Sequence, residues 1–195
     1  MSFFALSHDN SLKRHYALHK TVQFRAAFQP RRTVMDAQVE ALLKDQINKE
    51  LYSAYFYLAI AGFYQGRSLD GFSHWFARQS QEEQGHAIKI LNYLQDNRVD
   101  VEFAAIAGPV TDFQNNREPL EATLRHEQYI TSLIHDLYRE ARDADDFRTC
   151  QFLEWFIAEQ GEEEKQTGDL IAKFDLFGDD ARSLYLLNAE LKGRA

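Results

Sequence analysis

Apolar side chains recur every three or four residues in four long segments, which is the spacing of one face of an α-helix. The segments run from Asp36 to about Tyr64, from about Leu69 to Asp96, from Glu118 onward, and from about Phe147 to Phe174. In the first segment the apolar positions are Val39, Leu43, Ile47, Ala54, Leu58 and Ala61. Proline occurs only at positions 30, 109 and 119, so long helices are permitted. The pattern predicts an all-α fold.

Three breaks separate these segments. Gly66-Arg67-Ser68 and the polar run 143–146 are short, so each predicts a helical hairpin. The stretch from about Asn97 to Asn116 is longer and contains Gly108-Pro109. Extended at roughly 3.3 Å per residue it reaches about 60 Å, while a helix of this length spans about 40 Å. We therefore predict a four-helix bundle with a long crossover between helices 2 and 3.

A fifth, short helix is predicted after Gly178, with Asp179 or Asp180 as its N-cap. Its apolar side consists of Leu184, Leu187 and Leu191. A filled four-helix bundle has no room for a further apolar face, so we expect this side to dock on a neighbouring subunit.

Polar residues interrupt each long apolar stripe near its middle. Glu50, Glu83, Glu127 and Glu163 hold these positions, and His86 shares a helix face with Glu83. In each hairpin the two glutamates lie at equal sequence distance from the turn, so all four are expected at one level. Buried carboxylates need cations, which predicts two metal ions, with iron or manganese favoured and zinc a competitor. The alternative is that the helix phases are in error and the glutamates face solvent.

Further polar residues adjoin this set. Glu82 adjoins Glu83 off the main stripe, and Glu159 and Glu162 flank Gln160 and Glu163, which lie in the stripe of the fourth helix. Tyr57 could donate a hydrogen bond to a carboxylate ligand or supply an electron. The competing interpretations are a core tyrosine and solvated glutamates. We interpret Trp155 as a core residue, and His74, His126 and His135 as surface or hydrogen-bonded histidines.

The composition excludes several classes of protein and of metal site. The chain has 195 residues, a net charge of −8 and one cysteine, Cys150, which excludes intramolecular disulfides and cysteine-rich metal sites. The acidic body argues against nucleic-acid binding, and no apolar run is long enough to span a membrane. We expect a cytoplasmic protein with one domain over residues 35–195.

Residues 1–34 differ from the rest, because six Lys or Arg residues accompany a single acidic residue, Asp9. We expect either a disordered basic tail or translation from an upstream start, with Met35 as the true initiator. Import into an organelle is the alternative, since transit peptides are also basic and poor in acidic residues.

From about Met35 to its end the chain resembles the bacterial non-haem ferritins. The motifs are Asn48-Lys49-Glu50-Leu51-Tyr52-Ser53, Gln81-Glu82-Glu83 through His86, Glu127-Gln128, Phe152-Leu153-Glu154-Trp155, and Glu159-Gln160-Gly161-Glu162-Glu163-Glu164-Lys165. Di-iron carboxylate bundles of this kind carry glutamates from four helices and Glu-x-x-His motifs.

The resemblance implies a set of iron ligands. Glu50 and His86 would bind the first iron, Glu83 would bridge, and Glu127 with Glu163 would bind the second. A third iron site would comprise Glu82, Glu159, Glu162 and the shared Glu163, with Gln160 near the second iron and Tyr57 beside the centre.

The sequence differs from three other groups of this superfamily. Bacterioferritins carry a second Glu-x-x-His on the fourth helix, whereas this chain has no histidine after Glu163. Their haem-ligating methionine follows the bridging glutamate, where this chain has Gln84, so no haem is expected. Rubrerythrins carry a Cys-x-x-Cys module, which one cysteine cannot form. DNA-protecting mini-ferritins lack the fifth helix predicted here.

The resemblance thus implies an iron-storage ferroxidase, which oxidises Fe(II) with O2 or H2O2 and stores ferric mineral in a cage of 24 identical subunits. One alternative is a di-iron oxidase or peroxidase without storage. Another is a subunit with a degenerate site that only co-assembles. The sequence does not determine the oxidant, the electron donor for iron release, or whether other subunits join the cage.

Overall fold

The computed structural model describes residues 35–177 and 180–193, and within these residues it contains helices and no strand. The helices are α2 (Ala37–Gln65), α3 (Asp70–Asp96), α4 (Glu118–Asp143), α5 (Phe147–Phe177) and α6 (Ala181–Leu191). The predicted all-α class is confirmed, and the predicted ends of the first four helices lie within three residues of the observed ones. The predictions for residues 1–34 fall outside the described residues.

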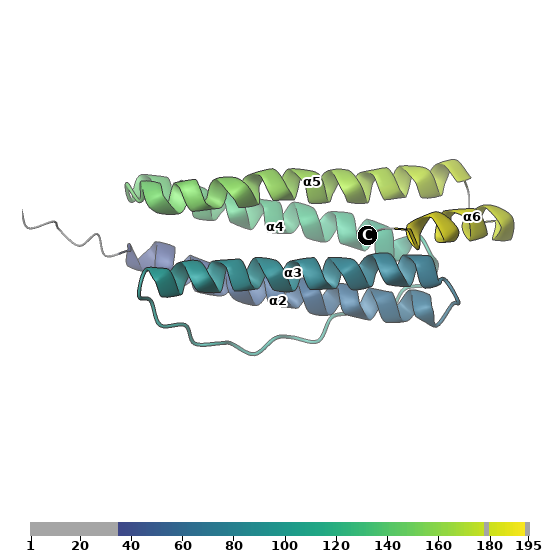
Figure 1. Ribbon diagram of the computed structural model, residues 1–195, viewed down its shortest axis with the longest axis horizontal. Coiled ribbons are helices and arrows are strands. Elements are labelled where there is room, and N and C mark those ends of the chain that lie inside the picture. The colour runs from purple at the N-terminus through teal and green to yellow at the C-terminus, as the bar shows by residue number, and fades with distance from the viewer. Residues whose placement is uncertain (1–34, 178–179, 194–195) are drawn as a thin grey trace, which may run out of the picture. The chain divides into compact units, whose positions relative to one another are not determined.

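The helices form two hairpins that pack side by side (Figure 1). Helices α2 and α3 make one hairpin, α4 and α5 the other, and α2 lies against α4. The chain between α3 and α4 runs as an extended strap along the α2–α3 hairpin to the opposite end of the bundle. The Asn48 side-chain amide lies 3.4 and 3.3 Å from the carbonyl oxygens of Ala104 and Ala105, which fastens the strap to α2. The predicted long crossover is confirmed.

Aspartate side chains cap the starts of α2 and α5. The Asp36 carboxylate accepts hydrogen bonds from the backbone N–H groups of Gln38 and Val39 at the start of α2. Asp146 does the same for Thr149 at the start of α5. Each hairpin turn contains one residue with positive φ, Ser68 at 60° and Asp145 at 55°, which reverses the chain within a few residues.

The bundle core consists of two apolar clusters separated along every long helix by a polar layer. One cluster, which we call the α6-end cluster, includes Tyr64, Phe72, Leu120 and Phe174. The other, the strap-start cluster, includes Leu43, Ile90, Ile134 and Leu153. The buried residues between them are mostly polar: Gln46, Glu50, Ser53, Gln79, Ser80, Glu83, His86, Thr123, Glu127, Gln160, Glu163 and Thr167.

The expectation for the fifth helix is wrong. Leu187 and Leu191 of α6 are buried in the α6-end cluster of their own subunit. The bundle end has room for α6 because residue 71 is glycine: a Cβ there would lie 1.7 Å from the Asn188 carbonyl oxygen. The Asn188 side chain in turn accepts hydrogen bonds from the N–H groups of Gly71 at 2.7 Å and Phe72 at 3.3 Å. Asp180 caps α6, whereas Asp179 lies outside the described residues.

Two further expectations are wrong. Leu58, placed in the buried stripe of the first helix, is 55% exposed, and Trp155, interpreted as a core residue, is 38% exposed. Both side chains lie on parts of their helices that the other helices do not fully cover. The histidine interpretations are confirmed, since His74 and His135 are exposed and His126 lies 2.8 Å from the Ser53 hydroxyl.

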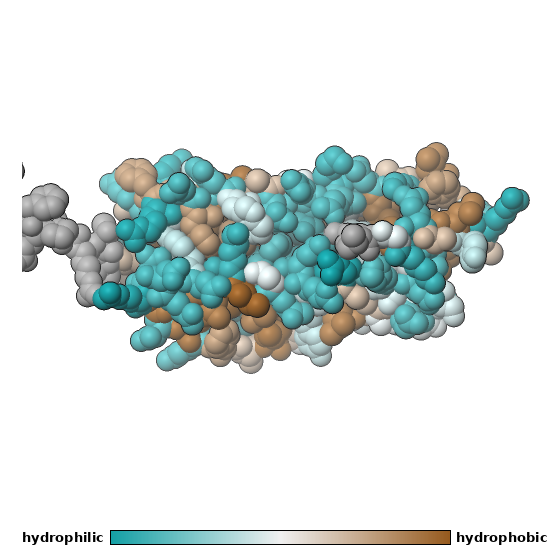
Figure 2. Space-filling view, viewed as in Figure 1, coloured by the Kyte–Doolittle hydropathy of each residue, from teal (hydrophilic) through white to brown (hydrophobic). Residues whose placement is uncertain are grey.

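The surface is mainly hydrophilic, with apolar side chains gathered along the strap edge and near the end formed by α5 and α6 (Figure 2). Exposed apolar residues at these places include Phe103, Val110, Leu176 and Tyr185. Among the described residues, none of the helices has an apolar stretch sufficient to cross a membrane.

Candidate metal centre

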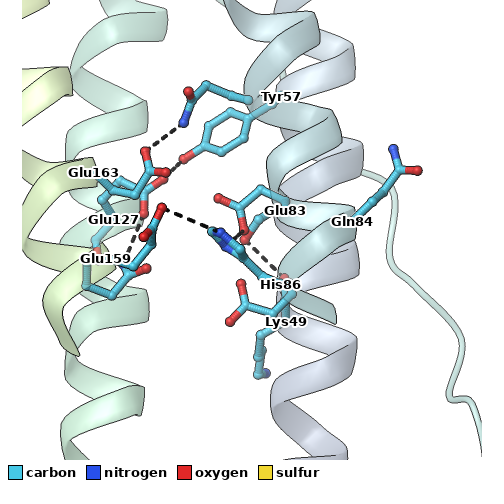
Figure 3. A network of polar contacts seen from close by, with 12 residues as sticks. Lys49, Tyr57, Glu83, Gln84, His86, Glu127, Glu159 and Glu163 are labelled. Carbon is cyan, nitrogen blue, oxygen red and sulfur yellow. Dashed lines mark hydrogen bonds and ion pairs between the residues drawn. The ribbon is translucent and has the colours of Figure 1, made fainter. Parts of the chain in front are cut away.

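One glutamate from each long helix enters the polar layer of the bundle. Glu50 lies on α2, Glu83 on α3, Glu127 on α4 and Glu163 on α5, and each is at most 2% exposed. His86, one turn after Glu83, is 6% exposed. The alternative in which these glutamates face solvent is therefore excluded. Figure 3 shows Glu83 and His86 pointing toward Glu127, Glu159 and Glu163, whereas Gln84 points away.

Three of these side chains form a first group. Ligand atoms of Glu50, Glu83 and His86 lie within 4.8 Å of one another, and His86 Nδ1 is 3.3 Å from Glu83 Oε2. Glu50 Oε2 is buried without a hydrogen-bond partner among the described residues, and the contact of His86 Nδ1 with Glu83 does not have the geometry of a hydrogen bond, so this buried atom has no hydrogen-bond partner there either. Buried polar atoms normally have a partner, so these two atoms are suited to a bound cation.

A second group shares the histidine. His86, Glu159 and Glu163 also have ligand atoms within 4.8 Å of one another, and His86 Nε2 lies 3.9 Å from Glu159 Oε1. Glu159 is half-buried and Glu162 exposed. Glu82 is half-buried and belongs to neither group, although its charge acts on Glu83 and Glu163. The residues predicted for a third iron thus extend from the polar layer toward the surface.

Glu127 is held differently and joins neither group among the described residues. The Tyr57 hydroxyl donates a hydrogen bond to Glu127 Oε1, and the Gln160 amide donates one to Glu127 Oε2 at 3.1 Å. Tyr57 is fully buried, with its ring against Phe76 and His126. The sequence-based expectation that Tyr57 could donate to a carboxylate therefore has its contact in the structure.

Sequence reasoning assigned no role to two buried glutamines in this layer. The Gln46 amide donates to Glu50 Oε1 at 2.8 Å, and the Gln79 amide donates to Glu163 Oε2 at 2.6 Å. A signal was present for Gln46, because it lies four residues before its acceptor Glu50 and so one helical turn from it. Gln79 lies four residues before Glu83, but its acceptor is Glu163 on another helix.

Burial makes these carboxyl groups weak acids. It raises the pKa of Glu83 and of Glu127 to about 8 and that of Glu163 to about 7, with the charges of neighbouring glutamates adding to the rise. The pKa of Glu50 is also raised well above its ordinary range, first by burial and then by the charge of Glu83. By contrast, burial lowers the pKa of His126 to about 4. A cation that replaces the protons would allow all four carboxylates to ionise in the interior.

Oxygen ligands with one imidazole suit iron or manganese better than soft metals. Four helices that each bring a carboxylate to one level, with a histidine one turn after one of them, define a ferritin-like carboxylate bundle.

Comparison with known proteins agrees with this class. The family model for the ferritin-like domain matches residues 40–177. A bacterial non-heme ferritin of Staphylococcus aureus is 38% identical over 152 residues, which cover 78% of this chain and 92% of the relative. The corresponding protein of Staphylococcus saprophyticus is 37% identical over 153 residues, with the same coverage. The chain therefore belongs to the ferritin family.

Solved structures give the same result. An open pore ferritin from the archaeon Archaeoglobus fulgidus superimposes with a TM-score of 0.81 at 36% identity, covering 83% of this chain and 99% of that one. The resemblance to bacterial non-haem ferritins is thus confirmed. Membership of the family supports iron binding, iron storage and ferroxidase chemistry in general terms.

Proposed function

We propose that the protein oxidises Fe(II) to Fe(III) at a di-iron centre within the bundle and stores the ferric product as mineral in a hollow cage of 24 identical subunits. The observation that carries this proposal is the set of four buried carboxylates at one level, one from each long helix, with His86 among them. Iron is the substrate and the cargo.

In this proposal Glu50 and His86 bind the first iron, Glu83 bridges, and Glu127 with Glu163 binds the second. The first three fit this role because their ligand atoms already lie together. Two Fe(II) ions each give up one electron, which reduces O2 to H2O2 or H2O2 to water, with protons taken from solvent. The protein contributes ligands and a buried, preorganised site.

The second group supports a third iron site and a route outward. Glu163 is buried, Glu159 half-buried and Glu162 exposed, and these residues follow one another along α5. Together with Glu82 they provide carboxylates of increasing exposure, along which ferric iron would leave the centre.

Tyr57 is proposed to hold Glu127 for the second iron, and Gln160 to assist it. The Tyr57 hydroxyl and the Gln160 amide donate to different oxygens of the Glu127 carboxylate. Two donors limit the rotation of the carboxylate without adding a charge that would repel iron.

Assembly into a cage is supported by the exposed apolar residues. Monomeric proteins seldom expose large groups of apolar side chains. In this chain the exposed apolar residues lie along the strap and on α6, where Tyr185 is 70% and Leu186 56% exposed. We propose that these faces meet other copies of the chain, and that the assembly works in the cytoplasm.

The experiment is anaerobic loading with Fe(II), followed by O2, with absorbance and particle mass recorded together. Storage predicts rapid oxidation of two to three irons per chain, then accumulation of mineral in a particle of hundreds of kilodaltons. Rapid oxidation in a small oligomer without mineral would instead show an oxidase or peroxidase. No uptake of iron would show a degenerate subunit.

A further inference from the structure

Two neutral amides donate hydrogen bonds to carboxylates of the centre. Gln46, 3% exposed, donates to Glu50 Oε1, and Gln79, 1% exposed, donates to Glu163 Oε2. At 2.8 and 2.6 Å both contacts are short enough to fix the orientation of the acceptor. The first joins two residues of α2, while the second crosses from α3 to α5.

The two contacts act on different groups of ligands. Glu50 belongs to the group with Glu83 and His86, and Glu163 to the group with His86 and Glu159. In Glu50, the amide occupies Oε1 while Oε2 is left buried without a partner. Gln46 therefore determines which oxygen is offered to a metal, and Gln79 engages one oxygen of Glu163 in the same way.

The chemistry of the donors matters as much as their position. A lysine or arginine at either place would neutralise the carboxylate and repel a cation, because a charged donor competes with the metal. An amide orients the carboxylate while leaving its charge for the metal. Outer partners of this kind commonly change metal affinity by 10–100-fold.

We infer that Gln46 and Gln79 are positioning residues for separate irons of the di-iron centre, Gln46 for the first iron, bound by Glu50 and His86, and Gln79 for the second, bound by Glu127 and Glu163. This inference rests on the proposed di-iron function. It predicts that the loss of either amide weakens the binding of one iron and spares the other.

The test is anaerobic calorimetric titration of the full-length protein with Fe(II) alone. Gln46→Met and Gln79→Met keep side-chain length and remove the N–H donor. We expect each to weaken one of the two irons by about 10–100-fold. Gln95→Met, at an exposed position of α3, is the matched control and should leave both affinities unchanged.

Double variants assign each effect to a ligand. With Glu163→Ala already present, Gln79→Met should cause no further loss, whereas with Glu50→Ala it should still cause its full loss. Gln46→Met should show the reverse pattern. Gln46→Asn and Gln79→Asn, which keep the amide but are one methylene too short, should repeat the result if a methionine variant does not fold.

The outcomes separate the two proposals. If the wild-type protein binds fewer than two Fe(II) per chain, the di-iron function fails and this inference with it. If the wild-type protein binds two, the inference is overturned when the glutamine variants bind both irons normally, when they weaken both equally, or when the losses add in every background.

Discussion

The apolar clusters and the polar layer between them are built from the same four helices but have opposite effects on the stability of the fold. In the clusters, Leu43, Ile90 and Ile134 are fully buried, and their removal from water favours folding. In the polar layer, Glu83 and Glu127 are buried just as deeply, but as carboxyl groups whose pKa is raised to about 8. The apolar clusters stabilise the bundle. The carboxylates of the polar layer oppose folding unless a proton or a metal ion neutralises them.

The largest effect on the polar layer is expected from Glu83→Ala. We expect the rapid phase of Fe(II) oxidation to slow by more than about 100-fold, because loss of a bridging ligand should exceed the usual effect of outer partners. The metal-free protein should keep its thermal stability, since a buried acid is removed. Stopped-flow absorbance and thermal unfolding measure the two quantities.

Glu162→Ala is the matched control for Glu83→Ala, because Glu162 is an exposed glutamate at the outer end of the proposed route. It should slow the rapid phase much less. Equal rates in the two variants would contradict the bridging role of Glu83.

Ile90→Ala should show the opposite pattern. Ile90 is fully buried in the strap-start cluster, so the substitution should destabilise the protein by about 2–5 kcal/mol through lost burial and a cavity. The oxidation rate per folded subunit should stay near that of the wild type. Ile88→Ala, on the same helix but 54% exposed, should cost far less in denaturant unfolding.

The polar layer also predicts how stability depends on pH. The carboxyl pKa values are raised in the folded state, so the protonated forms favour folding. Their stabilising contribution is complete below the ordinary carboxyl pKa near 4.5 and is lost as pH rises through about 7 to 8. The unfolding temperature of the metal-free protein should therefore fall by several degrees between pH 6 and pH 9.

Two controls sharpen the pH prediction. Zn(II), which cannot be oxidised, should remove most of the decline by replacing the protons, and Glu83→Gln should reduce it. A metal-free protein whose stability is the same at pH 6 and pH 9 would contradict the raised pKa values.

Gly71→Ala tests the docking of α6 and should have the smallest effect on the centre. The new Cβ would collide with the Asn188 backbone, so α6 should detach at a cost of about 1–3 kcal/mol, seen as faster amide exchange in α6. Fe(II) oxidation should be unchanged. Gly62→Ala is the control, since its Cβ would meet nothing within 4 Å and should stabilise α2 by about 1 kcal/mol.

Much of the fold and the centre could be predicted because the relevant signals are local or periodic. Helix limits follow from spacing and breaks, and Glu50, Glu83, Glu127 and Glu163 are conspicuous because they interrupt apolar stripes. The partner of Gln79 could not be predicted, because Glu163 lies on another helix and a stripe indicates burial and not which atom a side chain meets.

The errors arise where the outcome depends on packing between elements. Docking of α6 depends on the space left by Gly71 and on the reach of Asn188, which lie 117 residues apart. Leu58 and Trp155 sit at the edge of a helix face, where a small rotation decides between core and surface.

The most direct test of the central claim is a crystal structure of the protein loaded anaerobically with Fe(II), with anomalous diffraction recorded at the iron edge. The account predicts two anomalous peaks in the polar layer of each bundle, one beside Glu50 and His86 and one beside Glu127 and Glu163, with Glu83 between them, and allows a third nearer the surface beside Glu159 and Glu162. Peaks confined to surface carboxylates, with none in the polar layer, would contradict it.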